Sequence, residues 1–182
     1  MKELSLNILD IAENSVKAGA SLIEINLEET EQKLIISIKD NGCGMSKEVL
    51  KSVTDPFYTT RTTRKVGLGI PFFKMEAEQT GGKFEITSKE SNSSDDLHGT
   101  AVCAEFLKTS IDFIPLGNIS ESLVTLIQGH PDRDFLFKHS KADKTVTLDT
   151  RELRKILDDI PLDSYEVIKF IKEYLLEQYS DF

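Results

Sequence analysis

Two apolar segments with alternating patterns constrain the fold of this chain more than any other feature. In residues 22–29 and again in residues 33–40, three alternate side chains are Ile or Leu. A period of two is typical of strands that bury one face. The polar stretch EETEQK between them is short enough for a hairpin connection. The sequence therefore predicts an antiparallel pair of strands, the second of which ends at Asp40.

An amphipathic helix precedes this pair of strands. Residues 2–18 repeat apolar side chains at intervals of three and four, which is the spacing of one helical face. We expect that face to consist of Leu4, Ile8, Ile11 and Ser15, widened by Leu6, Leu9 and Val16. Further along, the patterns predict helices at 46–52 and 69–80 and strands at 83–89 and 99–107.

After residue 109 the pattern changes. We expect a strand at 111–117, a helix at 120–128, a hairpin built from DFLFKHS and KTVTLD, and two final helices. Each of the two final helices opens with Asp-x-x-Glu, which is similar to a capping box. The predicted fold class is α+β, with residues 1–109 as one domain and residues 110–182 as a small α+β extension packed on it.

Composition and charge argue against several classes of protein. The formal net charge is −9 and the one basic cluster is RTTRK, which disfavours nucleic-acid binding. No apolar run reaches about 18 residues, so no transmembrane helix is predicted. The acid-containing, amphipathic start is unlike a secretion signal. Cys43 and Cys103 lack metal-ligand spacing, and we expect two reduced thiols in a cytosolic protein.

A polar strip on the first helix carries candidate chemistry. Asp10 and Asn14 are four residues apart, as are Glu13 and Lys17, and this spacing brings side chains together on a helix surface. An amide oxygen can bind Mg²⁺, an ammonium can contact phosphate, and a carboxylate can accept a proton. The same strip also fits a solvated helix face with an ordinary Glu–Lys ion pair.

Glycine-rich segments follow at three points along the chain. Asp40 precedes Gly42 and Gly44, which fits either a loop lying against a ligand or ordinary turn chemistry. GLGIPFFK at 67–74 places glycines just before a helix, where unpaired amides and the helix dipole suit phosphate. The cations of RTTRK lie in an aperiodic loop that could close over phosphates. HGT, residues 98–100, stands at the start of the predicted strand 99–107.

The order of these motifs resembles the GHKL ATPase superfamily, which includes histidine kinases, anti-sigma serine kinases and MutL proteins. ENSVKAGASLIEI…IKDNGCGM is similar to MutL. DPFYTTR…GLGIPFFKMEAEQTGGKFEITS is similar to the ATP lid, second glycine box and following strand of histidine kinases. The resemblance covers residues 4–107. It implies the Bergerat fold, a two-layer α/β sandwich that binds ATP between its sheet and a lid.

The resemblance also implies roles for individual residues. Asn14 would hold Mg²⁺, Lys17 would contact phosphate, and Asp40 would accept a hydrogen bond from the adenine amino group. Thr100 would reach adenine through a water, and Phe57 would anchor the lid. The other residues implied to bind the nucleotide are Gly42, Gly44, Met45, Arg61, Lys65, Gly67, Leu68 and Gly69.

Two features depart from the family pattern. Hydrolysing members place a glutamate four residues before the asparagine as general base, whereas this chain has Asp10, one methylene shorter. Asp10 could be the base, directly or through a second water, or a supporting partner. Members usually also have a strand or helix before the first helix, whereas this chain begins almost at that helix. Something else must therefore cover that edge of the sheet, and the residues after 109 or a partner subunit could do so.

The resemblance leaves two functions open. In the first, the chain is a stand-alone Mg-ATP-binding module of the histidine-kinase type that transfers phosphate to a protein partner. No helix matches a dimerisation domain with its acceptor histidine, so we expect the phosphoacceptor in another chain. In the second, ATP closes the lid and switches a binding surface with little or no turnover. The acidic charge disfavours a DNA role, no membrane contact is expected, and a homodimer is left open.

Overall fold

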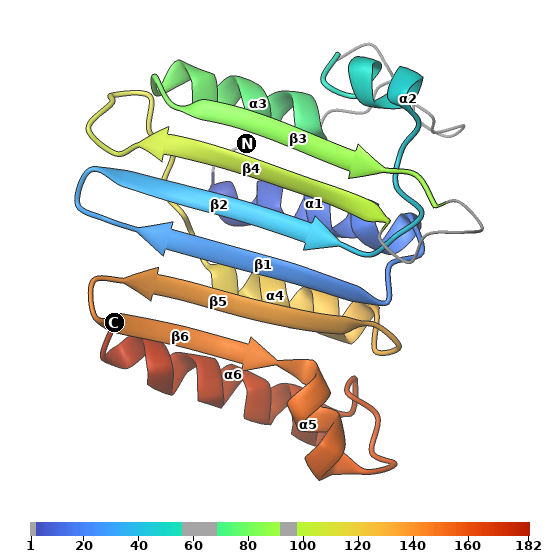
Figure 1. Cartoon of the computed structure of the whole chain (residues 1–182). Coiled ribbons are helices and arrows are strands. Elements are labelled where there is room, and N and C mark those ends of the chain that lie inside the picture. The colour runs from blue at the N-terminus through green and yellow to red at the C-terminus, as the bar shows by residue number, and fades with distance from the viewer. Residues whose placement is uncertain (1–2, 56–68, 92–97) are drawn as a thin grey trace.

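The computed structural model describes residues 3–55, 69–91 and 98–182 and shows a six-stranded sheet (Figure 1). The strand order is β3-β4-β2-β1-β5-β6, in which β1 and β5 run parallel and the other neighbours run antiparallel. In chain order the elements are α1 (Leu4–Lys17), β1 (Leu22–Glu29), β2 (Lys33–Asp40), α2 (Lys47–Ser52), α3 (Gly69–Gln79), β3 (Lys83–Lys89), β4 (Gly99–Leu107), α4 (Ile119–Gly129), β5 (Asp134–Lys141), β6 (Lys144–Asp149), α5 (Thr150–Leu157) and α6 (Tyr165–Ser180).

The helix α1 packs on the middle strands of the sheet through its apolar stripe. Leu4, Ile8 and Ile11 are buried, as predicted. Leu6, which we expected to widen the stripe, is 42% exposed, so that expectation is wrong. Two residues along an α-helix rotate a side chain by about 200°, and Leu6 therefore points away from the side on which Leu4 is buried.

The segment before α4 does not form the predicted strand. Residues 111–117 adopt turns and irregular backbone, so that prediction is wrong. The carbonyl oxygens of Pro115 and Leu116 instead accept hydrogen bonds from the backbone N–H groups of Leu4 and Ser5, at 3.0 and 2.8 Å. The first amides of a helix have no partner within that helix. The backbone of this segment therefore caps the N-terminus of α1, which has no side-chain cap.

The C-terminal elements extend the sheet. β5 pairs with β1 along its whole length, and β6 pairs with β5. β1 therefore has a neighbour on both sides within this chain, which supplies the edge cover that the sequence calls for. α4 packs on α1, and α6 packs on α4 and β6. The division into residues 1–109 and 110–182 stays a prediction, although both parts contribute to one sheet and one hydrophobic core.

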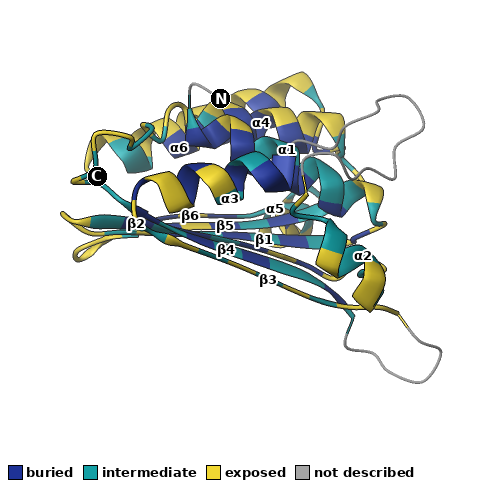
Figure 2. Cartoon of the chain, turned by 90° about the horizontal axis from the view of Figure 1, so that it is seen from above, coloured by how far each residue is buried: buried dark blue, intermediate teal, exposed yellow. Residues whose placement is uncertain are grey.

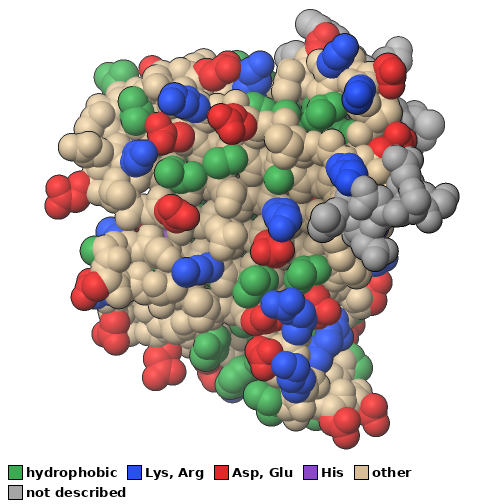
Figure 3. All heavy atoms as spheres, in the orientation of Figure 1, with side chains coloured by type: hydrophobic (Ala, Val, Ile, Leu, Met, Phe, Trp, Pro, Cys, Tyr) green, Lys and Arg blue, Asp and Glu red, His purple; other side chains and the backbone are tan. Residues whose placement is uncertain are grey.

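The two faces of the sheet have different surroundings. α1, α3, α4 and α6 cover one face, and no helix among the described residues covers the other (Figure 2). Acidic and basic side chains are interspersed over the open face (Figure 3), where Lys33 Nζ lies 2.9 Å from Glu105 Oε2. One buried and one solvated face is common in sheets that are largely antiparallel. The predicted α+β class and two-layer arrangement are confirmed.

The outer edge of β6 is partly blocked by a side chain of α6. The amide of Gln178 accepts a hydrogen bond from the Thr147 N–H and donates one to the Thr147 carbonyl oxygen, both at 3.0 Å. An unpaired strand edge can recruit another strand. Gln178 occupies the hydrogen-bonding groups at this position and so disfavours such pairing.

A buried polar cluster ties α6 to the sheet. His139 Nδ1 lies 2.9 Å from Tyr179 Oη, and His139 Nε2 lies 3.3 Å from Glu29 Oε2. Lys108 and Lys141 contact the other Glu29 oxygen at 2.6 and 3.3 Å. Burial lowers the pKa of His139 and raises the pKa of Tyr179. Burial alone would raise the pKa of Glu29, but the two lysines outweigh it and hold that pKa below its ordinary value.

We expect His139 to make the folded chain less stable in acid. Its pKa in the folded chain lies below the ordinary value of about 6.5, so the unfolded chain binds the proton more readily. The contribution of neutral His139 to the free energy of unfolding is complete above about pH 6.5. It is lost as the pH falls, by at most about 1.4 kcal/mol per pH unit. Urea unfolding from about pH 5 to 7 measures the slope.

The matched variant is His139→Gln, whose amide can still meet Tyr179 but does not titrate. Its free energy of unfolding should change less with pH over the same range than that of the wild type. An equal slope in the two proteins would show that His139 does not contribute to the acid sensitivity.

Candidate functional site

A buried carboxylate at the end of β2 joins three segments of the chain. Asp40 is 8% exposed, and its Oδ2 accepts a hydrogen bond from Ser15 Oγ of α1 at 2.7 Å. Its Oδ1 accepts bonds from the backbone N–H of Gly42 at 2.9 Å and of Thr100 at 3.2 Å. The predicted residues Asp40, Gly42 and Thr100 therefore lie together, and α1 reaches this group through the bond from Ser15 to Asp40.

These three hydrogen bonds do not exhaust the carboxylate. An ionised carboxylate has about four lone-pair positions, and the described residues fill three of them for Asp40. The three bonds hold its orientation, because each comes from a different element or loop. Asp40 can therefore serve both as an anchor between these segments and as an acceptor for a donor on a bound molecule.

Two glycines near Asp40 have backbone conformations that other residues rarely adopt. Gly44 has a φ of +68°, and a Cβ there would lie 1.9 Å from the Lys89 carbonyl oxygen. Gly99 has a φ of +125°, and a Cβ there would lie 2.0 Å from the Asp40 carbonyl oxygen. Both contacts are with backbone, which cannot move aside easily. The loop after β2 thus packs directly against the chain at the end of β3 and the start of β4.

A chain of hydroxyl groups positions the loop that contains Met45. The backbone N–H of Met45 donates to Ser88 Oγ at 2.8 Å, and Ser88 Oγ lies 2.9 Å from Thr100 Oγ1. His98 Nδ1 lies 2.6 Å from the Gly42 carbonyl oxygen. Met45 and Thr100 are thereby connected through Ser88, which the sequence did not single out.

The polar strip of α1 lies between α3 on one side and α4 on the other. Asp10 is so close to the start of α3 that a Cβ added to Gly69 would lie 2.2 Å from Asp10 Oδ2. Asn14 is half-buried and adjoins Ser15, the residue that contacts Asp40. Lys17 Nζ lies 3.9 Å from Glu13 Oε2. The strip thus borders both the Asp40 region and the N-terminus of α3.

The oxygen donors of this strip fit a magnesium ion that arrives with phosphates. Among the residues that the structure describes, no group of three or more His, Cys, Asp or Glu side chains could hold a metal ion alone. Mg²⁺ commonly takes one or two protein oxygens and completes its shell with water and substrate phosphate. The Asn14 amide oxygen, one helical turn from the Asp10 carboxylate, suits that role.

Part of the predicted site lies outside the described residues. The segment 56–68 contains the predicted lid residue and most of the predicted phosphate contacts. These residues are Phe57, Arg61, Lys65, Gly67 and Leu68. Their roles stay predictions from the resemblance, whereas Gly69, which follows them, begins α3.

Sequence reasoning missed two hydroxyl side chains that shape the site. Ser15 was placed within an apolar stripe, and Ser88 lies at an ordinary position in β3. A hydroxyl on the buried face of an amphipathic helix needs a hydrogen-bond partner, and that was a usable signal for Ser15. Ser88 gave no such signal, because alternate side chains of a strand often face solvent.

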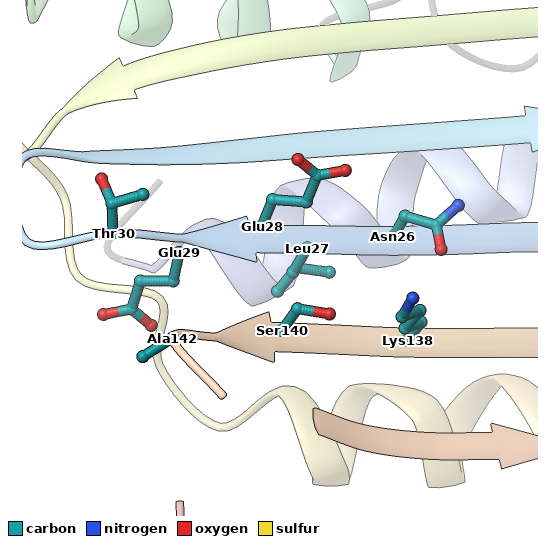
Figure 4. A pocket seen from close by; sticks show the side chains of 8 residues that line it. All are labelled: Asn26, Leu27, Glu28, Glu29, Thr30, Lys138, Ser140 and Ala142. Atoms are coloured by element: carbon teal, nitrogen blue, oxygen red, sulfur yellow. The ribbon is translucent and has the colours of Figure 1, made fainter. Parts of the chain in front are cut away.

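A cavity of about 570 Å³ lies over β1 and β5, away from Asp40 (Figure 4). Asp40 pairs with Ile23 near the start of β1, whereas the cavity begins at Asn26 and extends past the end of that strand. It is lined by Asn26, Leu27, Glu28, Glu29, Thr30, Lys138, Ser140 and Ala142. None of the predicted site residues lines it.

Comparison with known proteins places this arrangement in a family. Residues 2–110, more than half of the chain, match the family described as histidine kinase-, DNA gyrase B- and HSP90-like ATPases. The chain belongs to this family, and the predicted resemblance to GHKL ATPases is confirmed. It therefore carries an ATP-binding domain of the histidine-kinase type.

Two relatives are sensor proteins. Sensor protein KdpD of Clostridium acetobutylicum is 33% identical over 96 residues, which is 50% of this chain and 11% of that protein. Sensor protein SrrB of Staphylococcus aureus is 35% identical over 94 residues, which is 49% of this chain and 16% of that protein. The matches thus span a small part of the length of these curated relatives.

A solved structure shares the fold over nearly the whole chain. The MutL ATPase domain of Aquifex aeolicus, determined as a complex with ADP, has a TM-score of 0.53 at 12% identity. The match covers 95% of this chain and 88% of that chain, so it includes the C-terminal elements. Within the described ranges, no helix combines the length and the apolar character needed to cross a membrane.

We expect Gly99→Ala to destabilise the chain by about 2 kcal/mol or more. The added Cβ would meet the Asp40 backbone, and the positive φ is strained for any other residue. Gly129→Ala is the matched control, because a Cβ there meets nothing within 4 Å. Gly129 ends α4, so alanine there should be neutral or stabilise by up to about 1 kcal/mol. Urea unfolding measures both, and equal stabilities would contradict the close approach at Gly99.

Proposed function

We propose that the chain binds Mg-ATP at the end of the sheet marked by Asp40 and transfers its γ-phosphate to a separate protein. The observation that carries this proposal is the Asp40 carboxylate, buried and oriented by three donors, with α1 hydrogen-bonded to it. The base would sit at Asp40, and the phosphates would lie towards Lys17 and the start of α3. The family membership of residues 2–110 supports ATP as the nucleotide.

Recognition of the base would depend on the remaining acceptor position of Asp40. The adenine amino group is a donor that a carboxylate can accept, whereas the guanine carbonyl at the equivalent ring position cannot donate. A buried hydrogen bond to a charged group is worth about 1.5–3 kcal/mol. Thr100, whose backbone already contacts Asp40, would add a water-mediated contact.

The metal would be held between Asn14 and the phosphates. Its chemistry would be charge neutralisation of the phosphate oxygens when ATP is bound. The chain's own contribution would be the Asn14 amide oxygen on a rigid helix, with the Lys17 ammonium as a further cation beside the phosphates. The N-terminus of α3, at Gly69, would add backbone amides and the positive end of its dipole.

Phosphate transfer would require an acceptor from outside the chain. All three histidines already have partners. His98 contacts the Gly42 carbonyl oxygen, His130 contacts a glutamate, and the buried His139 contacts a tyrosine and a glutamate. A hydroxyl or imidazole of the partner would attack the γ-phosphorus, and the bond from that phosphorus to the ADP oxygen would break. Asp10, beside the start of α3, would accept the proton of an attacking hydroxyl.

The cysteines fit a reducing compartment for this activity. Cys43 is exposed, Cys103 is half-buried, and neither forms a disulfide. Burial and the nearby Glu85 carboxylate raise the pKa of the Cys103 thiol, which keeps it protonated and unreactive. We propose a cytosolic location, where such thiols stay reduced.

A second function is favoured by the position of Asp10. Its side chain is one methylene shorter than the family glutamate, and it lies against Gly69. In this second function, the carboxylate held there would interact with the N-terminus of α3 instead of activating a nucleophile. In that case ATP would switch the conformation of the chain and its binding surface with little or no turnover.

Incubation with γ-labelled ATP and candidate partner proteins separates the two functions. Label on a partner supports transfer, whereas tight ATP binding without transfer or phosphate release supports the switch.

We expect Asp40→Asn to abolish ATP binding, because the amide would present a donor where the base needs an acceptor. Calorimetric titration with ATP measures this effect. An unchanged affinity would mean that the base pocket lies elsewhere.

We expect Asp10→Asn to suppress phosphate release or transfer while ATP affinity stays within about threefold of wild type. The substitution removes the proton acceptor but keeps the size of the side chain. Asp112→Asn, an exposed carboxylate outside the site, is the control for a general loss of charge. A release rate equal to that of wild type in Asp10→Asn would rule out Asp10 as the base.

A further inference from the structure

The turn between α4 and β5 contacts the polar strip of α1. His130, directly after α4, places Nε2 2.8 Å from Glu13 Oε1. The other Glu13 oxygen faces Lys17 at 3.9 Å. We propose that His130 is a positioning residue for phosphate binding: it holds Glu13, and Glu13 in turn controls the availability of Lys17. This inference rests on the proposed ATP site and names a regulatory contact within it.

The turn that carries His130 is firmly held. Arg154 of α5 donates from Nη2 to the carbonyl oxygens of Pro131 and Arg133, at 2.6 and 2.9 Å. Arg154 Nε also donates to Asp134 Oδ1 at 2.8 Å. Such a multiply bonded guanidinium fixes both position and orientation. His130 therefore approaches α1 from a rigid support in the C-terminal region.

The same turn also holds the loop that follows α1. Arg133 Nη1 donates to the Ala20 carbonyl oxygen at 3.2 Å, and the Asp134 N–H donates to the Ser21 carbonyl oxygen at 2.9 Å. The side chain of Asn41, the residue after Asp40, accepts a hydrogen bond from the Ser21 N–H at 2.9 Å. The loop after α1 is thus bonded both to the C-terminal turn and to the residue that follows Asp40.

The contact gives Glu13 two partners that differ in mobility. The His130 side chain is 24% exposed, whereas the Lys17 side chain is 56% exposed and its ion pair with Glu13 is long. An exposed pair of this kind contributes little and breaks readily. Lys17 can therefore leave Glu13 for a phosphate, provided that Glu13 keeps a donor when Lys17 has gone. His130 is that donor.

Removing His130 changes this balance. Glu13 would then depend on Lys17, and turning Lys17 to a phosphate would leave a carboxylate with no partner close to an anionic ligand. Phosphate binding should weaken, whereas binding of the base should not change. The C-terminal region would in this way influence the affinity of the site for ATP, because His130 belongs to the turn that Arg154 of α5 holds by hydrogen bonds.

Calorimetric titration with ATP and with adenosine tests the proposal on the intact chain. We expect His130→Ala to raise the Kd for ATP by about three- to tenfold and to leave the Kd for adenosine unchanged. His130→Gln, whose amide nitrogen can take the place of Nε2, should restore most of the ATP affinity. In a Glu13→Gln background, the added His130→Ala change should have no further effect.

The outcomes that would contradict the proposal differ according to the step that fails. An ATP Kd unchanged in His130→Ala, or a Kd raised by the same factor for ATP and for adenosine, would exclude the positioning role. A His130→Ala effect that persists in Glu13→Gln would exclude the path through Glu13. Lys169→Ala, which breaks an exposed pair of the same 3.9 Å length on α6, is the control and should change neither Kd. Absence of ATP binding by the wild type would overturn the proposed function itself.

Discussion

The hydrogen bonds of one buried carboxylate hold the candidate site together. Asp40 receives donors from α1, from its own loop and from the first residues of β4, so three segments far apart in the sequence meet at one side chain. Leaving such a group without partners would cost several kcal/mol, roughly 2–7 for a polar group and more for a charge. Gly44 and Gly99 are required because the backbone closes tightly around this point. In the proposed function, fold and ligand recognition thus depend on the same interactions.

The helix α1 is the element through which the rest of the molecule reaches that carboxylate. Its first amides are satisfied by the segment before α4, and its last turn is held by the turn after α4. On the α3 side, the buried Asn7 amide donates to Glu76, and Asp10 lies against Gly69. The C-terminal region therefore contacts α1 near both of its ends, and α1 connects that region to the candidate site.

Regular elements were predictable where periodicity was strong. The alternating strands, α1 and the order of motifs up to residue 107 followed from spacing, because burial of one face imposes a period of two or 3.6. Errors arose where local pattern and packing disagree. Residues 111–117 are apolar enough for a strand but instead supply carbonyl groups to α1, and Leu6 lies on the outer side of its helix. The backbone of residues 111–117 is decided by the neighbour that the segment meets, whereas the exposure of Leu6 follows from its rotation about the helix axis relative to Leu4.

By itself, the sequence determined the fold class, the family and the carboxylate at the end of β2, since each of these is written in local spacing and motif order. The tertiary structure alone decided that Ser15 would bind Asp40, that β5 would pair with β1, and that His130 would reach Glu13. These contacts join residues 25 to 117 positions apart in the chain. No periodicity encodes a pairing at such a distance; it is fixed by how the helices pack on the sheet as the whole core becomes buried.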